Sequence, residues 1–353
     1  MAGRADIASL PYWVAGLAAG TVGAALFVSA ALGSPVLGVL LYFAPLPVFL
    51  AGLGWGAVAA GIAALTGMVL LSFLNSFTAG LVFFVLNGAV PFWLIRQALL
   101  YRQVGPRRAS EPQSDAPEDA LAQIEWYPVG DLVLWITGIA VAFFIFATVG
   151  VTLAGYTGGV EEALRRLLVE ALVNTGLLED ALNANGLETS PDTILSLITA
   201  VLPAAAAGLW ISLTLGNLLL AQKLLKRWGL TLRPTINLEG MTLPRAYLWG
   251  FLAAVALSMV PGEMAYFGGT IAVILAMPYF LLGLAVIHAI SRPWVARTAF
   301  LGLFYVLLLV YGWPAIPVWL LGMFESWVGL RARITDVMNQ TGQQPGPGRH
   351  QGD

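Results

Sequence analysis

The chain has 353 residues, of which 59% are hydrophobic and 10% are charged, and its mean hydropathy is +0.82. A soluble domain carries about 25% charged residues, so this composition excludes a soluble globular protein and requires many apolar spans of roughly 20 residues each. The net charge of −2 argues against a nucleic-acid partner. With no cysteine and only two histidines, one of them His350 in the tail, we expect no metal site and no cofactor.

Ten apolar stretches predict an all-α, polytopic bundle of transmembrane helices, with eight spans as the lower limit. They cover residues 13–32, 35–53, 55–74, 79–100, 130–153, 192–220, 247–260, 270–290, 294–312 and 315–330. The first stretch has a second interpretation, as a cleaved leader with a small-residue site at 28–30. Its apolar run continues without a break and Arg4 is offset by Asp6, so we favour an uncleaved span. Gly16 and Gly20, spaced as GxxxG, predict close packing on another helix.

A polar segment divides the apolar stretches into four and six. Residues 101–128 are rich in proline, serine and charge and lack an apolar period, which predicts a flexible cytoplasmic linker. The predicted domains are therefore an N-terminal four-span bundle (1–100) and a C-terminal six-span bundle (129–333). Residues 334–353 form a polar tail that we expect to be disordered and cytoplasmic.

Two further segments are too polar to span a membrane. Apolar residues recur at helical spacing over 159–185, opposite a charged face in which Glu161–Arg165 and Glu162–Arg166 are spaced for ion pairs. This pattern predicts an external amphipathic helix, either a lid over a solute cavity or a helix lying in the headgroup layer. Residues 222–245 predict a basic loop that either docks a cytoplasmic partner or contacts anionic lipid.

The distribution of basic residues predicts the orientation. If the N-terminus is cytoplasmic and the chain crosses ten times, every Lys and Arg except Arg165 and Arg166 lies on the cytoplasmic side. We therefore predict a multi-pass protein of the bacterial inner membrane with both termini in the cytoplasm. A miscounted pair of spans would leave the other loops on their predicted sides.

Four stretches carry a resemblance to a known family. They are GLAVIHAISRP at 283–293, LLGMFESWVGLRAR at 320–333, APLPVFLAGLGWG at 44–56 and LNGAVPFWL at 86–94. These stretches resemble the YybS-type family of bacterial membrane proteins of unknown function. That family is distantly similar to the substrate-binding subunits of energy-coupling-factor vitamin transporters. The resemblance implies a small solute bound within the bundle and ATPase and transmembrane coupling subunits as partners, and it carries over no catalytic residue.

Two ionisable residues fall within predicted spans, where charge is costly. His288 lies near the cytoplasmic end of the eighth span and Glu325 near that of the tenth. One interpretation is a hydrogen-bonded His–Glu pair that couples solute or proton movement. The other is a pair of interfacial groups that reach water or bond to neighbouring helices.

Prolines within the even-numbered spans suggest a cavity. Pro45 and Pro47, in the span that also contains Tyr42, are accompanied by Pro91, Pro203, Pro278 and Pro317. Each proline frees a backbone carbonyl, which membranes tolerate where it lines a cavity or finds a partner. Asn87 and Asn217 are candidates to supply polar contacts there. The alternative is that the kinks only improve packing of the bundle.

The chain lacks the GxxxxGK[ST], HExxH and GxSxG patterns, so we expect neither an enzyme nor an autonomous ATPase. The leading hypothesis is a component for small-solute binding or uptake, embedded in the lipid bilayer, that depends on a separate ATPase. The alternative is a membrane scaffold without transport activity, which organises other proteins through its loops.

Overall fold

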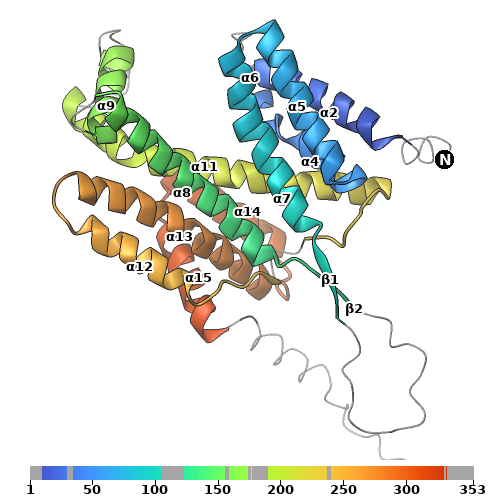
Figure 1. Ribbon diagram of the computed structural model, residues 1–353. Helices are drawn as coiled ribbons and strands as arrows, with labels where there is room; N and C mark the ends of the chain where they lie inside the picture. Colours follow the sequence, from blue (N-terminus) through green and yellow to red (C-terminus); the bar gives the residue numbers. More distant parts are fainter. Residues whose placement is uncertain are drawn as a thin grey trace, which may run out of the picture. The chain divides into compact units, whose positions relative to one another are not determined.

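The computed structural model describes residues 10–29, 35–104, 123–155, 159–173, 176, 190–236, 240–329 and 331, and these are mostly helical (Figure 1). The chain divides into two compact units, one formed by Met1–Ala140 with Ala205–Asn237 and the other by Val141–Ala204 with Leu238–Asp353. The division falls inside two long helices, α8 (Val129–Leu153) and α11 (Pro191–Trp228). It therefore differs from the boundary expected at the linker.

The first unit contains, besides parts of α8 and α11, eight helical segments and two strands among its described residues. They are α2 (Tyr12–Val28), α3 (Pro35–Leu40), η2 (Leu41–Phe43), α4 (Leu46–Trp55), α5 (Ala57–Leu74), α6 (Phe77–Phe83), η3 (Phe84–Ala89), α7 (Val90–Ala98), β1 (Tyr101–Val104) and β2 (Gln123–Trp126), with η2 and η3 short 3₁₀ and π segments.

Close packing of α2 on α5 follows from the glycines of α2, as the GxxxG spacing predicts. A Cβ at Gly16 would lie 2.8 Å from the carbonyl oxygen of Ala59, and one at Gly20 would overlap the carbonyl of Ala63. The two backbones are therefore in contact at both positions, and any side chain larger than hydrogen would separate the helices.

The ends of the expected linker are ordered, which corrects the prediction of a flexible segment over all of 101–128. Strands β1 and β2 pair antiparallel, with Tyr101 opposite Trp126 and Arg102 opposite Glu125. The first pair brings two rings to 5.4 Å between centroids, and the second forms an ion pair of 2.7 Å. Cross-strand pairs of these kinds stabilise a short hairpin that composition alone does not predict. Residues 105–122 lie outside the described part of the chain.

The second unit contains the remaining parts of α8 and α11 and six further helical segments. They are α9 (Gly159–Leu168), η4 (Val169–Val173), α12 (Tyr247–Ser258), α13 (Glu263–Ile290), α14 (Arg297–Tyr311) and α15 (Ala315–Val328). Segments α9 and η4 confirm helical structure over 159–173 of the predicted amphipathic helix; of its remainder, only residue 176 is described, as a bend.

The ten predicted stretches correspond to helices, but the count of ten spans is not confirmed. Among the described residues, six helices or joined helices are long and apolar enough to cross a membrane. Helices α2 and α12 are apolar but shorter, and α14 and α15 pass the length test only as a pair bent by 117°. The bent pair of α14 and α15 is either one broken span or a re-entrant segment, so the described residues contain six or seven candidate spans.

The predicted basic loop begins later than expected. Helix α11 continues to Trp228, so Lys223, Lys226 and Arg227 lie on its last turns and not in a loop. The helix ends where Gly229 adopts a φ of +76°. This is the left-handed conformation that glycine provides at helix ends.

Helices α13 and α15 cross at a pair of glycines. A Cβ on Gly322 would overlap the carbonyl oxygen of Tyr279, and a Cβ on Gly283 would overlap the carbonyl oxygen of Val318. Each glycine therefore lies against a carbonyl four residues from the other glycine, and the two backbones touch at this crossing.

Candidate functional site

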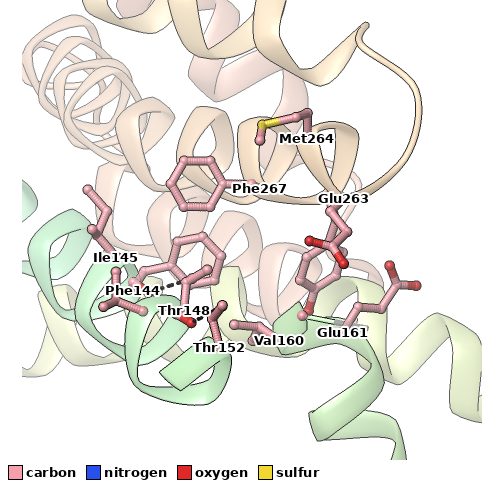
Figure 2. Close-up of a pocket in the computed structure, with 12 residues that line it drawn as sticks. Phe144, Ile145, Thr148, Thr152, Val160, Glu161, Glu263, Met264 and Phe267 are labelled. Atoms are coloured by element: carbon pink, nitrogen blue, oxygen red, sulfur yellow. Dashed lines mark hydrogen bonds between the residues drawn. The ribbon is translucent and has the colours of Figure 1, made fainter. Parts of the chain in front are cut away.

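A pocket of about 320 Å³ in the second unit has the size and composition of a small-ligand site. Its walls come from α8, the first turn of α9 and the first turns of α13 (Figure 2). The lining is mostly apolar, with the rings of Phe144 and Phe267 at one end and the carboxylates of Glu161 and Glu263 at the other (Figure 2).

The position of Glu263 depends on two glycines with positive φ. Gly262 has a φ of +87° and precedes α13, which begins at Glu263. Gly159 has a φ of +66° and begins α9, and a Cβ at this position would lie 3.2 Å from the carboxyl carbon of Glu263. The carboxylate of Glu263 therefore rests against the N-terminus of α9, where the partial positive charge of the helix favours an anion.

The two arginines of α9 are engaged away from the pocket. Arg166 pairs with Glu162 at 2.7 Å, which confirms one predicted ion pair. Arg165 pairs with Asp192 of α11 at 2.8 Å and not with Glu161, so the other predicted pair is wrong. Asp192 lies in the first turn of α11 and binds the Arg165 guanidinium in place of Glu161. Glu161 consequently faces the pocket without a basic partner among the described residues.

The apolar end of the pocket is built from aromatic rings. Phe144 and Phe267 stack with centroids 5.6 Å apart and an interplanar angle of 29°. Tyr266 presents its ring to the pocket and donates its hydroxyl to the carbonyl of Thr199 at 2.8 Å. The hydroxyls of Thr148 and Thr152 donate to carbonyls of their own helix, 2.9 and 3.0 Å away (Figure 2). The arrangement suits a ligand with an apolar body and a positive charge.

The predicted His288–Glu325 pair is not formed in the structure. The Nδ1 atom of His288 lies 2.9 Å from the carbonyl of Leu284, and Nε2 lies 3.5 Å from the hydroxyl of Tyr305. Glu325 instead accepts a 2.7 Å hydrogen bond from Nε of Arg331, with only 4% of its side chain exposed. His288 and Glu325 thus each have a hydrogen-bond partner within the chain, which agrees with the interpretation that these side chains bond to neighbouring elements.

The partner of Glu325 is set by the end of α15. Gly329 has a φ of +63°, and its N–H donates to the carbonyl of Glu325, so the helix stops and the chain turns back. Arg331 then reaches the Glu325 carboxylate and donates from Nη2 to the carbonyl of Met241 at 2.6 Å. This contact joins the residues after α15 to the segment before α12.

The structure brings Tyr42 and Asn217 together in the first unit. The helical segments η2 and α4 are separated at Ala44–Pro45, shortly after Tyr42, and Pro47 lies in the first turn of α4. The Nδ2 atom of Asn217 donates to the carbonyl of Tyr42 and to that of Leu213, both at 2.8 Å. Asn217 is 3% exposed, and its Oδ1 has no hydrogen-bond partner in the part of the chain that the structure describes. A broken helix and a buried amide thus meet in the first unit, and the cavity that we expect at this place stays a prediction.

Asn87 lies in the π segment η3, four residues before Pro91. Proline cannot donate the N–H that would bond to the carbonyl of residue 87, and widening of the helix is a common response to that loss. Asn87 is half-buried and is not among the residues that line the pocket described above.

The sequence reasoning missed the pocket residues Glu161, Glu263, Phe144 and Phe267. Glu263 lies between the predicted spans 247–260 and 270–290, where it directly follows Pro261-Gly262 and begins a long apolar helix. The expected lid is closer to the observed site, because α9 supplies Gly159 and Glu161 to the pocket wall. Among the described residues, no group of three or more His, Cys, Asp or Glu could hold a metal ion.

Several long apolar helices, with most polar groups bonded inside the chain, define a multi-span integral membrane protein. The chain belongs to the family described as predicted membrane protein (DUF2232), whose model matches residues 128–326. The match includes every residue of the pocket. No curated protein and no solved structure matches the chain.

Proposed function

We propose that this protein binds a small organic cation with an apolar or aromatic body, as a solute-binding component of a bacterial inner-membrane uptake system. The observation that carries this proposal is a pocket that combines two carboxylates, Glu161 and Glu263, which have no basic partner among the described residues, with the stacked rings of Phe144 and Phe267. Carboxylates favour cations over anions, and ring faces attract positive charge that an apolar wall shields from water.

The remaining parts of the proposal rest on the sequence. The chain carries no Walker-type motif, so ATP-driven uptake would require a separate ATPase subunit. The resemblance to energy-coupling-factor substrate-binding subunits supports such a partner. The distribution of basic residues supports an external position for α9, which would open the pocket to the outside.

Isothermal titration of the purified full-length protein with benzyltrimethylammonium tests the proposal. This probe carries a fixed positive charge next to one ring. Benzyl alcohol and benzenesulfonate serve as neutral and anionic probes with the same ring. We expect saturable binding of the cation only, because the apolar wall is common to all three probes and the carboxylates select the charge.

Two variants and a matched control locate the binding. Glu263→Gln should weaken the affinity for benzyltrimethylammonium about fivefold, corresponding to about 1 kcal/mol for one partly exposed charge pair. Phe267→Leu should weaken it by a similar factor through the lost cation–π contact. Glu162→Gln removes the same charge from the same region, but Glu162 pairs with Arg166 and does not line the pocket. It should leave the affinity unchanged.

Equal binding of the three probes, or an equal loss in Glu162→Gln and Glu263→Gln, would refute the proposal. Absence of cation binding together with stable co-purification of other membrane proteins would favour the alternative, a scaffold without transport activity.

A further inference from the structure

A second cavity, unrelated to the acidic pocket, lies between α14 and α15. It encloses about 530 Å³ and is lined by apolar and aromatic side chains. They are contributed by α13 (Ile287), by α14 (Phe300, Phe304, Leu307 and Tyr311), by the bend (Trp313 and Pro314) and by α15 (Pro317, Val318 and Leu321).

This cavity is a groove between α14 and α15, and it exists because α15 is packed closely on α13 whereas α14 is not. Helix α15 is fixed on α13 by the Gly283–Gly322 crossing, whereas α14 has no buried residue among those described. The contact of α14 with α13 includes the His288–Tyr305 approach of 3.5 Å. A 117° bend at 312–314 then leaves a wedge between α14 and α15 that the side chains of the described residues do not fill.

The dimensions of the groove suit one acyl chain. From Phe300 to Tyr311 the helix advances 11 residues, which is about 16 Å. This length is about half of the roughly 30 Å hydrocarbon core, so it corresponds to one leaflet. The lining offers almost no polar partner, which excludes a polar solute in the groove.

A positively charged side chain lies at one end of the face of α14 that lines the groove. Arg297 begins α14 and lies one turn before Phe300 and two turns before Phe304, on the side that lines the groove. Its Nε atom is buried and has no hydrogen-bond partner among the described residues. Trp294, whose ring contacts Phe300 at 4.8 Å between centroids, is of the type enriched at membrane–water interfaces.

We infer that the groove between α14 and α15 binds one anionic phospholipid, with an acyl chain along Phe300–Tyr311 and the phosphate at Arg297. Guanidinium groups bind phosphate oxygens through paired N–H donors, which would use the free Nε of Arg297. The lipid fills the wedge and so holds α14 in place. This inference does not depend on the proposed solute pocket.

Native mass spectrometry of the full-length protein tests this inference. The protein is equilibrated with equal amounts of dioleoyl phosphatidylglycerol and dioleoyl phosphatidylcholine, which share acyl chains and differ in headgroup charge. We expect one retained phosphatidylglycerol per chain. Arg297→Gln should reduce its preference over phosphatidylcholine about fivefold, the effect of one cation near an anionic lipid surface. Arg292→Gln removes the same charge five residues earlier and should leave the preference within about twofold.

The groove itself is tested with a second pair of variants. Leu307→Trp fills the groove and should reduce retention of both lipids, whereas Leu309→Trp on the 85% exposed position of the same helix should not. Circular dichroism of each variant verifies folding, which neither change should affect because α14 has no buried residue.

Phosphatidylglycerol with a diazirine at the end of one acyl chain maps the site directly. We expect crosslinked peptides from residues 300–321. Crosslinks confined to other helices, equal retention of the two lipids by the unmodified protein, or equal losses in Arg292→Gln and Arg297→Gln would overturn the inference.

Discussion

The close crossing of α13 and α15 predicts that Gly322→Ala lowers the stability of the protein. In Gly322→Ala, the added methyl carbon would stand 2.6 Å from the amide nitrogen of Gly283 and 2.8 Å from the carbonyl carbon of Tyr279. It would also overlap the carbonyl oxygen of Tyr279. All these atoms belong to backbone in a regular helix, so no side-chain rotation relieves the contact.

The size of the effect follows from the separation that the methyl group requires. Ordinary contact begins at 3.4 Å, so the approach to the Gly283 nitrogen is short by 0.8 Å. Moving packed helices apart by 0.5–1 Å forfeits about a quarter to a half of the dispersion energy at each contact. Overpacking of this kind costs about 1–3 kcal/mol, and contacts with rigid backbone on both helices place this substitution at the upper end of that range. We expect Gly322→Ala to lower the free energy of unfolding by about 3 kcal/mol.

The free energy of unfolding can be measured by titrating sodium dodecyl sulfate into micelles of a mild detergent, with circular dichroism as the readout. Gly250→Ala is the matched control, because Gly250 is exposed on α12 and a Cβ there meets nothing within 4 Å. This control should be neutral or stabilising by up to about 1 kcal/mol, since alanine favours a helix more than glycine does. Equal free energies for Gly322→Ala and Gly250→Ala would refute the close crossing.

Three further variants test buried polar contacts. Glu325→Gln should lower the free energy of unfolding by about 3 kcal/mol, because the side chain of Arg331, which is only 14% exposed, loses its ion partner. Adding Arg331→Met should recover most of that loss, and additive losses in the double variant would contradict the pairing. Gln222→Leu should cost about 2 kcal/mol and accelerate hydrogen exchange at the N–H of Ile236, which donates to Gln222 at 2.8 Å; unchanged exchange would show that this bond is not limiting. Asn217→Leu removes a donor and also an unpaired buried oxygen, so thermal unfolding should show a loss below about 1 kcal/mol, whereas Asn217→Asp should cost more than about 3 kcal/mol.

The sequence predicted the helices well because their cause is local. An apolar run of about 20 residues forms a helix in a membrane since its backbone has no other hydrogen-bond partners. The amphipathic pattern from Gly159 and the glycine spacing of α2 are also local, and the structure has α9 and the α2–α5 contact where they predict them. The number of spans was harder, because composition does not reveal that α14 and α15 are bent by 117°.

The ion pairs show where local reasoning stops. The i,i+4 rule assigned Arg165 to Glu161 within one helix, but Asp192 of a different helix takes the guanidinium. Glu325 and Arg331 are six residues apart, so on a continuous helix they would be separated by about 9 Å along its axis. The left-handed turn at Gly329 ends the helix, and the Glu325 carboxylate accepts a 2.7 Å hydrogen bond from Arg331. Both cases show that tertiary partners and helix ends decide which charges meet.

The hydrogen-bond and ion-pair partners of a polar side chain indicate whether it has a structural role or is available to a ligand. A polar group inside a span is stable only if the chain satisfies it. Arg331 and Glu325 satisfy each other, and Gln222 satisfies the backbone of the following segment at two atoms. Glu161 and Glu263 differ, because they lie at helix starts beside a pocket and have no basic partner among the described residues. Two like charges on one wall repel each other, so a bound cation would relieve that repulsion, and this is the physical basis for assigning the pocket to a cationic solute.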